Sequence, residues 1–316
     1  MTALEILTPS YRPDLGLFVE LHRSVLEFTD ASVVHHVVVP RRDVALFESV
    51  AAELSSARLR VTAEESVLPR RFVRIDGPTR ALSAIPGLTA LRKVKMVDAR
   101  SPWPPVRNWI LQQIVKLAVA ERSSATVVLV VDSDVCLVRP LTADDLHANG
   151  VTRFYARPHG VGPGMADHRA WHDDSRRLLG LEPVTTSTLP DYIAGFVTWD
   201  PVLVRATLDR VSAVSGRHWV DTIAGSLRFS EYTLYGTFVD HLADPAARDF
   251  ARPTTLCAGH WDARPLDQVS AADLLGAVRP EDHAVLIQST SDTPVGLRRE
   301  VVQAARRKVM GASDGR

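Results

Sequence analysis

The chain has 316 residues, with 37 Lys plus Arg and 37 Asp plus Glu, so its formal charge is zero. Hydrophobic residues make up 46% and charged residues 23%, values typical of folded globular proteins, which excludes an extended disordered chain and a coiled coil. The balanced charge argues against a protein whose main task is to coat nucleic acid. It still allows a local site for a small anion.

The sequence also constrains where the protein works. No apolar run approaches the roughly 20 residues that cross a bilayer, and the N-terminal segment lacks the basic and apolar regions of a secretory signal. Only two cysteines occur, Cys136 and Cys257, which is too few for a disulfide framework. We therefore expect a cytoplasmic enzyme without a nucleic-acid partner and with at most peripheral membrane contact.

The first part of the chain alternates between strand and helix patterns. Strands are predicted over 4–7, 33–39 and 59–61, and helices over 15–28 and 44–54, which indicates a parallel sheet with helices on its faces. The proline-rich segment 69–105 is predicted to be irregular, with one possible strand at 94–97. A helix over 106–122 then precedes a continuous apolar strand over 125–131, which needs cover on both faces.

The pattern is mixed after this strand. Further strands are predicted over 154–156, 192–199 and 284–288, helices over 171–179, 201–214, 230–242 and 295–310, and a flexible loop over 159–164. We expect an α/β fold with a nucleotide-binding half (1–145) and an acceptor-binding half (146–316). The two halves can share one sheet.

Two aspartates directly follow the apolar strand in the sequence VVLVVDSD at 127–134. Their spacing places Asp132 and Asp134 on the same side of an extended chain. Two adjacent carboxylates repel each other unless a cation joins them, and hard oxygen ligands suit Mg²⁺ or Mn²⁺, which can bridge the phosphates of a substrate. The simpler alternative is a strand-end turn with two solvated acids.

Two enzyme classes end a buried strand with this motif. In GT-A glycosyltransferases it holds the metal and diphosphate of a nucleotide sugar, whereas in haloacid-dehalogenase-type phosphatases its first aspartate, here Asp132, is the nucleophile. The phosphatase motif normally opens its fold, but here about 130 residues precede it. The later Asp173-Asp174 pair lies in a helical stretch, which fits poorly with a phosphatase.

Several further motifs occur in a fixed order around the acid pair. They are RNWILQQIVKL at 107–117, SEYTLYG at 230–236 and GHW at 259–261. Together with the acid pair, this set resembles a bacterial domain-of-unknown-function family that is grouped with GT-A glycosyltransferases. The resemblance extends over most of the chain and implies a GT-A-like mixed sheet flanked by helices.

The resemblance also implies roles in binding the donor. Thr8, Ser10 and Tyr11 would contact the base and ribose, although this segment is equally well explained as a polar turn. Asp134 and Asp132 would hold Mn²⁺ or Mg²⁺, with Asp132 also reaching the ribose or sugar. The late histidine His260 would be a further metal or diphosphate ligand, since neutral imidazole binds Mn²⁺ well.

The remaining candidates concern the acceptor and the sugar. Glu231 would be the base that deprotonates the acceptor, and Asp191 is a second candidate acid. Alternatively, Glu231 is an ordinary acid in the first turn of a helix capped by Ser230. Gln112 and Lys116 lie on one polar helix stripe that faces either the diphosphate or solvent, and Gly195 would let backbone approach the donor sugar.

These observations predict a metal-dependent glycosyltransferase of the hexosyltransferase type. Its donor would be a UDP- or GDP-linked sugar and its acceptor a glycan, a lipid-linked molecule or a small molecule. The alternatives are the phosphatase with Asp132 as nucleophile and a non-catalytic nucleotide-sugar binder. The basic C-terminal helix over 297–310 either touches anionic lipid or packs on the core.

Overall fold

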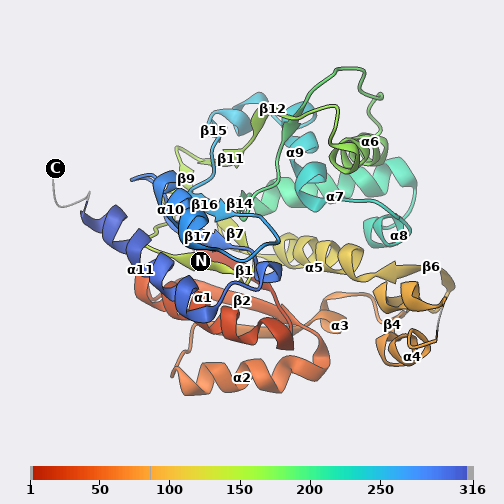
Figure 1. Cartoon of the computed structure of the whole chain (residues 1–316). Coiled ribbons are helices and arrows are strands. Elements are labelled where there is room, and N and C mark those ends of the chain that lie inside the picture. The colour runs from red at the N-terminus through yellow and green to blue at the C-terminus, as the bar shows by residue number, and fades with distance from the viewer. Residues whose placement is uncertain (1–2, 86, 312–316) are drawn as a thin grey trace.

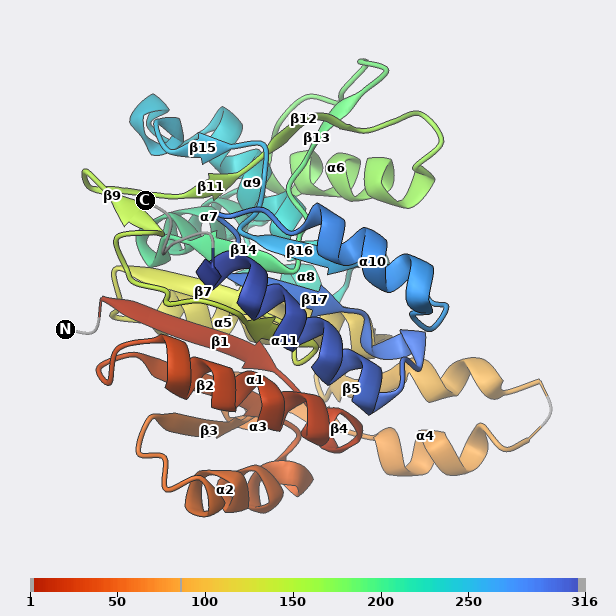
Figure 2. The same ribbon diagram turned by 60° about the vertical axis from the view of Figure 1, so that its left-hand side comes forward.

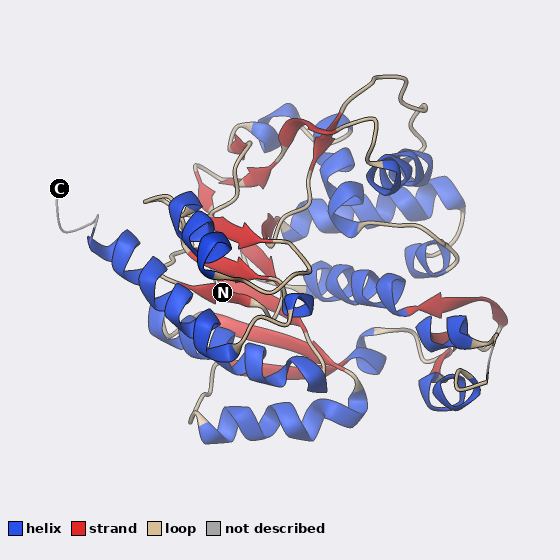
Figure 3. Cartoon of the chain, viewed as in Figure 1, coloured by secondary structure: helices blue, strands red, loops and turns tan. Residues whose placement is uncertain are grey.

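The computed structural model describes residues 3–85 and 87–311. Its main sheet has five strands in the order β14-β7-β1-β2-β3. Their bounds are β1 (Leu4–Pro9), β2 (Val34–Val39), β3 (Leu59–Ala63), β7 (Val127–Val131) and β14 (Phe196–Trp199). All neighbouring pairs are parallel except β14 with β7. The predicted α/β fold with a mixed sheet is therefore confirmed (Figure 3).

Helices cover both faces of this sheet. Residues of β7 alternate between the two faces: Leu129 packs in one core with α1 (Leu15–Phe28), and Val128 packs in another with α5 (Asn108–Arg122). The next helix, α2 (Val44–Glu53), packs beside α1 and β2. Because β7 is buried on both faces, its sequence is a continuous apolar run.

A second sheet continues from the acid pair. β8 (Val135–Leu137) pairs with β17 (Ala284–Ile287), which also pairs with β16 (Cys257–His260). This sheet is covered by α10 (Gln268–Ala277) and by α11 (Val295–Gly311), which lies beside α1 (Figure 2). The predicted strand at 284–288 is confirmed, whereas helix α10 was not predicted.

The proline-rich segment is more regular than predicted. β4 (Phe72–Arg74), β5 (Val94–Asp98) and β6 (Ser101–Arg107) form a small antiparallel sheet that projects from the main body with α4 (Asp76–Leu82) (Figure 1). The short helix α3 (Glu64–Val67) leads into it. β6 contains three prolines but lies at the sheet edge, where a missing N–H is tolerated. The strand predicted at 94–97 is confirmed by β5, whereas the prediction that the rest of the segment is irregular was wrong.

The later part of the chain adds a helical layer around α6 (Ala166–Leu179), α7 (Pro201–Ser215), α8 (Trp219–Ala224) and α9 (Glu231–His241). Four short strands form two further pairs, β9 (His147–Ala148) with β10 (Val151–Thr152), and β11 (Phe154–Tyr155) with β15 (Ala251–Arg252). Ser230 caps α9 by accepting from the Thr233 N–H, as predicted.

Two predictions in this region were wrong. The glycine-rich loop predicted at 159–164 begins as a strand, β12 (Arg157–Val161), which pairs with β13 (Leu189–Asp191). The continuous strand predicted at 192–199 starts only at Phe196. Asp191 interrupts it because its carboxylate accepts a hydrogen bond from the Ile193 N–H, which turns the chain.

The two predicted halves are interleaved. β14, from the second half, forms the edge of the main sheet beside β7, and β8, from the first half, pairs with β17. The division at residue 145 therefore does not separate two folding units. None of the described helices is both long and apolar enough to cross a membrane.

Candidate active site

The candidate site lies at the point where the strand order of the main sheet reverses, on either side of β1. β2 and β7 flank β1 on opposite sides, so the carboxyl ends of β1 and β7 border the crevice at which open α/β sheets bind ligands. The two ends contact each other, since the Ser133 hydroxyl donates to the Ser10 hydroxyl at 2.8 Å. A cavity of about 450 Å³ opens here, and Tyr11, Asp132 and Asp134 line it.

Three aspartates make this end of the cavity acidic. Asp14, which the sequence analysis did not single out, lines the cavity with Asp132 and Asp134. Burial, followed by repulsion from Asp132, raises the pKa of Asp14 and of Asp134 to about 6. A cation between these groups would relieve that repulsion.

The oxygens of the acid pair fit a divalent metal ion. The Asp134 Oδ2 atom accepts from the Ser289 N–H at 2.7 Å, whereas the buried Oδ1 atom has no hydrogen-bond partner among the described residues. Nearly all buried polar atoms are paired in proteins, so this oxygen indicates a missing partner. Carboxylate oxygens are the ligands that Mg²⁺ and Mn²⁺ prefer. Within the described ranges, however, no three His, Cys, Asp or Glu side chains already form a metal-binding group.

His260 does not line the cavity that the acid pair lines. It ends β16, and β17 separates that strand from the start of β8, so the His260 backbone lies roughly 10 Å from that of Asp134. The His260 Nε2 atom instead lies 3.1 Å from the Arg264 carbonyl oxygen. Its neighbour Trp261 lines the cavity.

Lys116 is buried at the centre of the site. Its ammonium lies 3.1 Å from Glu231 Oε1, 3.4 Å from Asp132 Oδ1 and 3.2 Å from the Tyr232 hydroxyl. Burial lowers the pKa of Lys116, but Asp132, Tyr232 and Glu231 raise it more, so the net pKa is well above its usual value. The lysine therefore connects Asp132, a candidate metal ligand, to the candidate base Glu231.

Glu231 is held in place from α5. The Gln113 side-chain oxygen accepts a hydrogen bond from the Glu231 N–H at 3.0 Å, which explains the second glutamine of the QQxxKL motif. Only 2% of Glu231 is exposed. Burial raises its pKa and Lys116 partly offsets this, leaving a net increase. Gln112, the other predicted polar residue of this helix, also lines the cavity.

Aromatic side chains form another part of the lining, which the sequence analysis did not find. Trp109, His168, Trp171 and Trp261 all line the cavity. Trp109 and Trp171 come from α5 and α6 and stack with ring centres 5.9 Å apart. The exposed positions at the start of α5 gave no sign that these residues would meet.

Besides His260, four predicted residues lie outside this cavity. Thr8 is fully buried and its hydroxyl lies 3.0 Å from His35 Nε2, and Ser10 contacts only its inner edge through Ser133. Asp191 and Gly195 line an adjoining cavity of about 320 Å³, where Asp191 pairs with Arg157 at 3.2 Å. A Cβ atom on Gly195 would lie 2.2 Å from a Leu286 methyl carbon, so the glycine makes room for packing.

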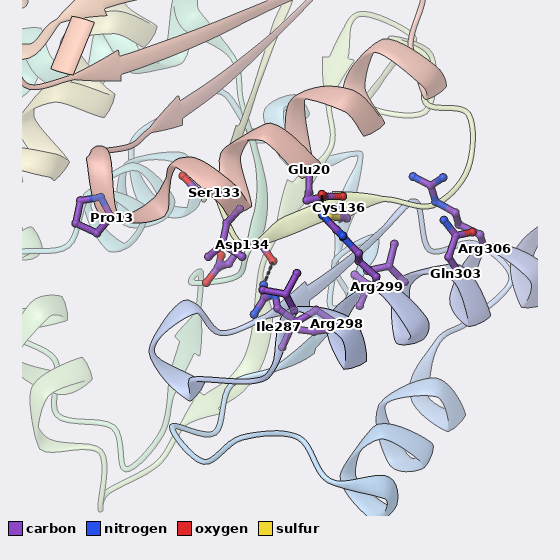
Figure 4. Close-up of a pocket in the computed structure, with 15 residues that line it drawn as sticks. Pro13, Glu20, Ser133, Asp134, Cys136, Ile287, Arg298, Arg299, Gln303 and Arg306 are labelled. Atoms are coloured by element: carbon purple, nitrogen blue, oxygen red, sulfur yellow. Dashed lines mark hydrogen bonds and ion pairs between the residues drawn. The ribbon is translucent and has the colours of Figure 1, made fainter. Parts of the chain in front are cut away.

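A second cavity adjoins the acid pair on its other side. It measures about 560 Å³, lies between α1 and α11, and shares Ser133 and Asp134 with the first (Figure 4). The Arg298 guanidinium approaches the Asp134 main-chain oxygen at 3.4 Å and the Gln288 carbonyl at 3.5 Å. Asp134 thus forms part of the wall between the two cavities.

The basic side chains of α11 mostly contact the protein itself. Arg299 and Arg306 pair with Glu20 and Glu27 of α1 at 2.7 and 2.8 Å, and Lys308 donates to carbonyl groups of α10. These contacts favour the alternative of a core-packing helix.

The model of a family of unknown function (DUF6492) matches residues 4–269, which is most of the chain. The chain belongs to this family. The predicted membership of a domain-of-unknown-function family is therefore confirmed. No curated protein sequence matches the chain.

Similar solved structures include mouse xyloside xylosyltransferase 1 in its apo form, at 10% identity over 92% of this chain and 99% of that chain, with a TM-score of 0.45. They also include the galactosyltransferase LgtC in complex with donor and acceptor sugar analogues, at 12% identity over 95% of each chain, with a TM-score of 0.43.

Proposed function

We propose that the protein is a metal-dependent glycosyltransferase that transfers a sugar from a nucleotide-diphosphate sugar to a hydroxyl acceptor. The observation that carries this proposal is the acid pair at the crevice between β1 and β7, with a buried and unpartnered oxygen on Asp134. This is the edge of an open α/β sheet where nucleotides bind.

The charge of the cavity supports a requirement for metal. The described residues that line it include four acids, Asp14, Asp132, Asp134 and Glu231, and a single basic side chain from lysine or arginine, Lys116. Two of these acids already share the Lys116 ammonium. A diphosphate would therefore meet net negative charge. A bound Mn²⁺ or Mg²⁺ would offset that charge and stabilise the leaving diphosphate.

Glu231 supports the transfer step. It is buried, and the Lys116 ammonium favours its charged form, while its raised pKa makes it a better proton acceptor than an exposed carboxylate. We assign it as the base that takes the proton of the acceptor hydroxyl. Asp191 pairs with Arg157 in the adjoining cavity and is assigned to acceptor contacts.

The test is turnover of UDP- and GDP-linked hexoses. We expect the wild-type protein with Mn²⁺ or Mg²⁺ to release UDP or GDP slowly without acceptor and none with EDTA. Asp134→Asn, which keeps the side-chain shape, should abolish release. The matched control is Asp209→Asn on the exposed surface of α7, which should behave as wild type.

Other outcomes distinguish the alternatives. Release that persists in Asp134→Asn would contradict the metal site. Hydrolysis of simple phosphomonoesters that depends on Asp132 would favour the phosphatase. If the protein binds nucleotide sugars but neither hydrolyses them nor transfers the sugar to any acceptor, the non-catalytic binder would be favoured.

A further inference from the structure

Three aromatic side chains, Trp109, His168 and Trp171, form what we call the aromatic wall of the cavity. Trp109 and Trp171 stack with an angle of 21° between their planes, and the His168 ring lies 4.7 Å from that of Trp171. Trp109 nevertheless leaves 51% of its surface exposed. An exposed aromatic surface inside a cavity indicates a ligand that covers it.

The aromatic wall lies beside the candidate base. The Trp109 Nε1–H donates to the Phe229 carbonyl at 2.9 Å, two residues before Glu231. One turn further along α5, Gln113 accepts from the Glu231 N–H. Two residues of α5, Trp109 and Gln113, therefore fix this part of the aromatic wall relative to Glu231. A molecule that covers the wall would therefore lie beside Glu231, which is where the acceptor of the proposed reaction must bind.

The chemistry of the lining favours a sugar ring. A pyranose has one face of C–H groups, which are attracted to the negative face of an aromatic ring, and an edge of hydroxyls that need hydrogen bonds. The cavity offers both, because Gln112, Ser230 and Gln288 line it together with the indoles. A lipid chain would leave these polar groups unpaired, which costs free energy.

Building on the proposed glycosyltransferase function, we infer that the acceptor is a saccharide, one pyranose ring of which stacks on the aromatic wall. Its hydroxyl oxygen forms a bond to the anomeric carbon of the donor. The bond between that carbon and the diphosphate oxygen breaks, and its electron pair leaves with the nucleotide diphosphate. The hydroxyl proton passes to Glu231.

The nucleotide base is assigned elsewhere. Tyr11 is 41% exposed and lines the cavity from the loop after β1, next to the acid pair. This position keeps the base near the sheet crevice and leaves Trp109 and Trp171 for the acceptor. The assignment predicts that removing the aromatic wall spares donor binding.

The experiment compares Trp109→Ala and Trp171→Leu with Trp103→Ala. Trp103 is a matched control, because it is 81% exposed on β6 and does not line the cavity. Maltotriose, cellotriose, chitotriose and lactose are titrated without donor while intrinsic tryptophan fluorescence is recorded. The same saccharides are then added to the Mn²⁺-dependent release of UDP or GDP.

We expect at least one saccharide to change the fluorescence and to accelerate release. In each aromatic-wall variant the saccharide should bind about tenfold more weakly, both in the fluorescence titration and in the saccharide concentration needed to accelerate release. Tenfold is the factor that about 1.4 kcal/mol of lost stacking produces. Trp103→Ala should resemble wild type in saccharide binding and in the release of UDP or GDP.

Three results would overturn the inference: no response to any of the four saccharides, wild-type saccharide responses in both variants, or loss of UDP binding in Trp109→Ala, which would place the base on the wall. Failure of the proposed function is distinguishable, because saccharide binding is measured without donor. A wild-type protein that binds saccharides through Trp109 but releases no nucleotide would refute only the transferase proposal.

Discussion

At the scale of single residues, Lys116 contacts more side chains of the site than its sequence pattern predicts. The prediction placed it against the diphosphate, as part of a polar stripe. In the structure Lys116 is only 7% exposed, and its ammonium is already shared between Glu231 and Asp132. Asp132 is partly exposed, so its pair with the lysine contributes less than the fully buried pair with Glu231.

Removal of this lysine should destabilise the protein because it leaves a buried carboxylate without its partner. We expect Lys116→Met to lower the free energy of unfolding at pH 7 by about 3 kcal/mol. The double variant Lys116→Met/Glu231→Gln should recover part of that loss, since no unpaired charge remains at Glu231. Urea denaturation of the wild type, Lys116→Met, Glu231→Gln and the double variant measures the coupling energy between the two side chains. Losses that simply add would contradict a direct interaction between the two residues.

At the scale of elements, the regular helices and strands of the first part could be predicted from the sequence. Apolar periodicity marks α1 and α2 because each buries one face against the main sheet, and a continuous apolar run marks β7 because both of its faces are covered. The strand β6 was missed because its prolines are acceptable only at a sheet edge, and no local pattern reveals that position. Pairing between distant segments likewise made β12 a strand despite its glycine.

Helix α9 packs against the loop after β13 without room for a side chain at Gly236. A Cβ atom there would lie 2.2 Å from the Tyr192 ring, which is buried and held by Asp240. Gly236→Ala should therefore destabilise the fold by about 2 kcal/mol. The control is Gly276→Ala in α10. An added Cβ atom there would meet no packing neighbour within 4 Å, so alanine should stabilise the helix by up to about 1 kcal/mol. Thermal unfolding measures both, and a stabilised Gly236→Ala would contradict the packing.

Helix α1 and strand β2 are joined by two buried histidines. The Nδ1 atoms of His22 and His35 lie 2.9 Å apart, and their outer nitrogens contact Ser56 and Thr8. Burial, followed by the charge of Arg58, lowers the pKa of His22 to about 4, and burial also holds the pKa of His35 well below its usual value. Both rings are therefore neutral in the folded protein near pH 7.

This pair predicts a specific dependence of stability on pH. Below pH 6.5 these histidines bind protons in the unfolded chain but stay neutral in the folded protein. Protonation therefore favours the unfolded chain, and the free energy of unfolding decreases as the pH falls towards 4. Buried acids with raised pKa values act in the opposite direction, so we compare wild type with His22→Gln. The stability advantage of wild type should shrink by about 1.4 kcal/mol for each pH unit below 6.5. Parallel curves from pH 7 to 4.5 would contradict a neutral His22.

At the scale of the whole molecule, the site combines segments that are far apart in the sequence. Its acids could be predicted because a polar pair after a buried strand must lie at the sheet edge. The sequence could not show how far His260 lies from the acid pair. That distance depends on β17, which lies between β16 and β8 in the second sheet. Asp14 and the aromatic wall were missed because ordinary helix positions carry them, and only the packing of α1, α5 and α6 brings them to the cavity.

The central claim is that the acid pair binds a diphosphate only through a metal ion. Isothermal titration of the wild-type protein with UDP and with GDP, in Mn²⁺ and in EDTA, tests it most directly. We predict binding of at least one nucleotide in Mn²⁺, none in EDTA, and none by Asp134→Asn under either condition. Equal binding in EDTA, or binding by Asp134→Asn in Mn²⁺, would contradict the claim.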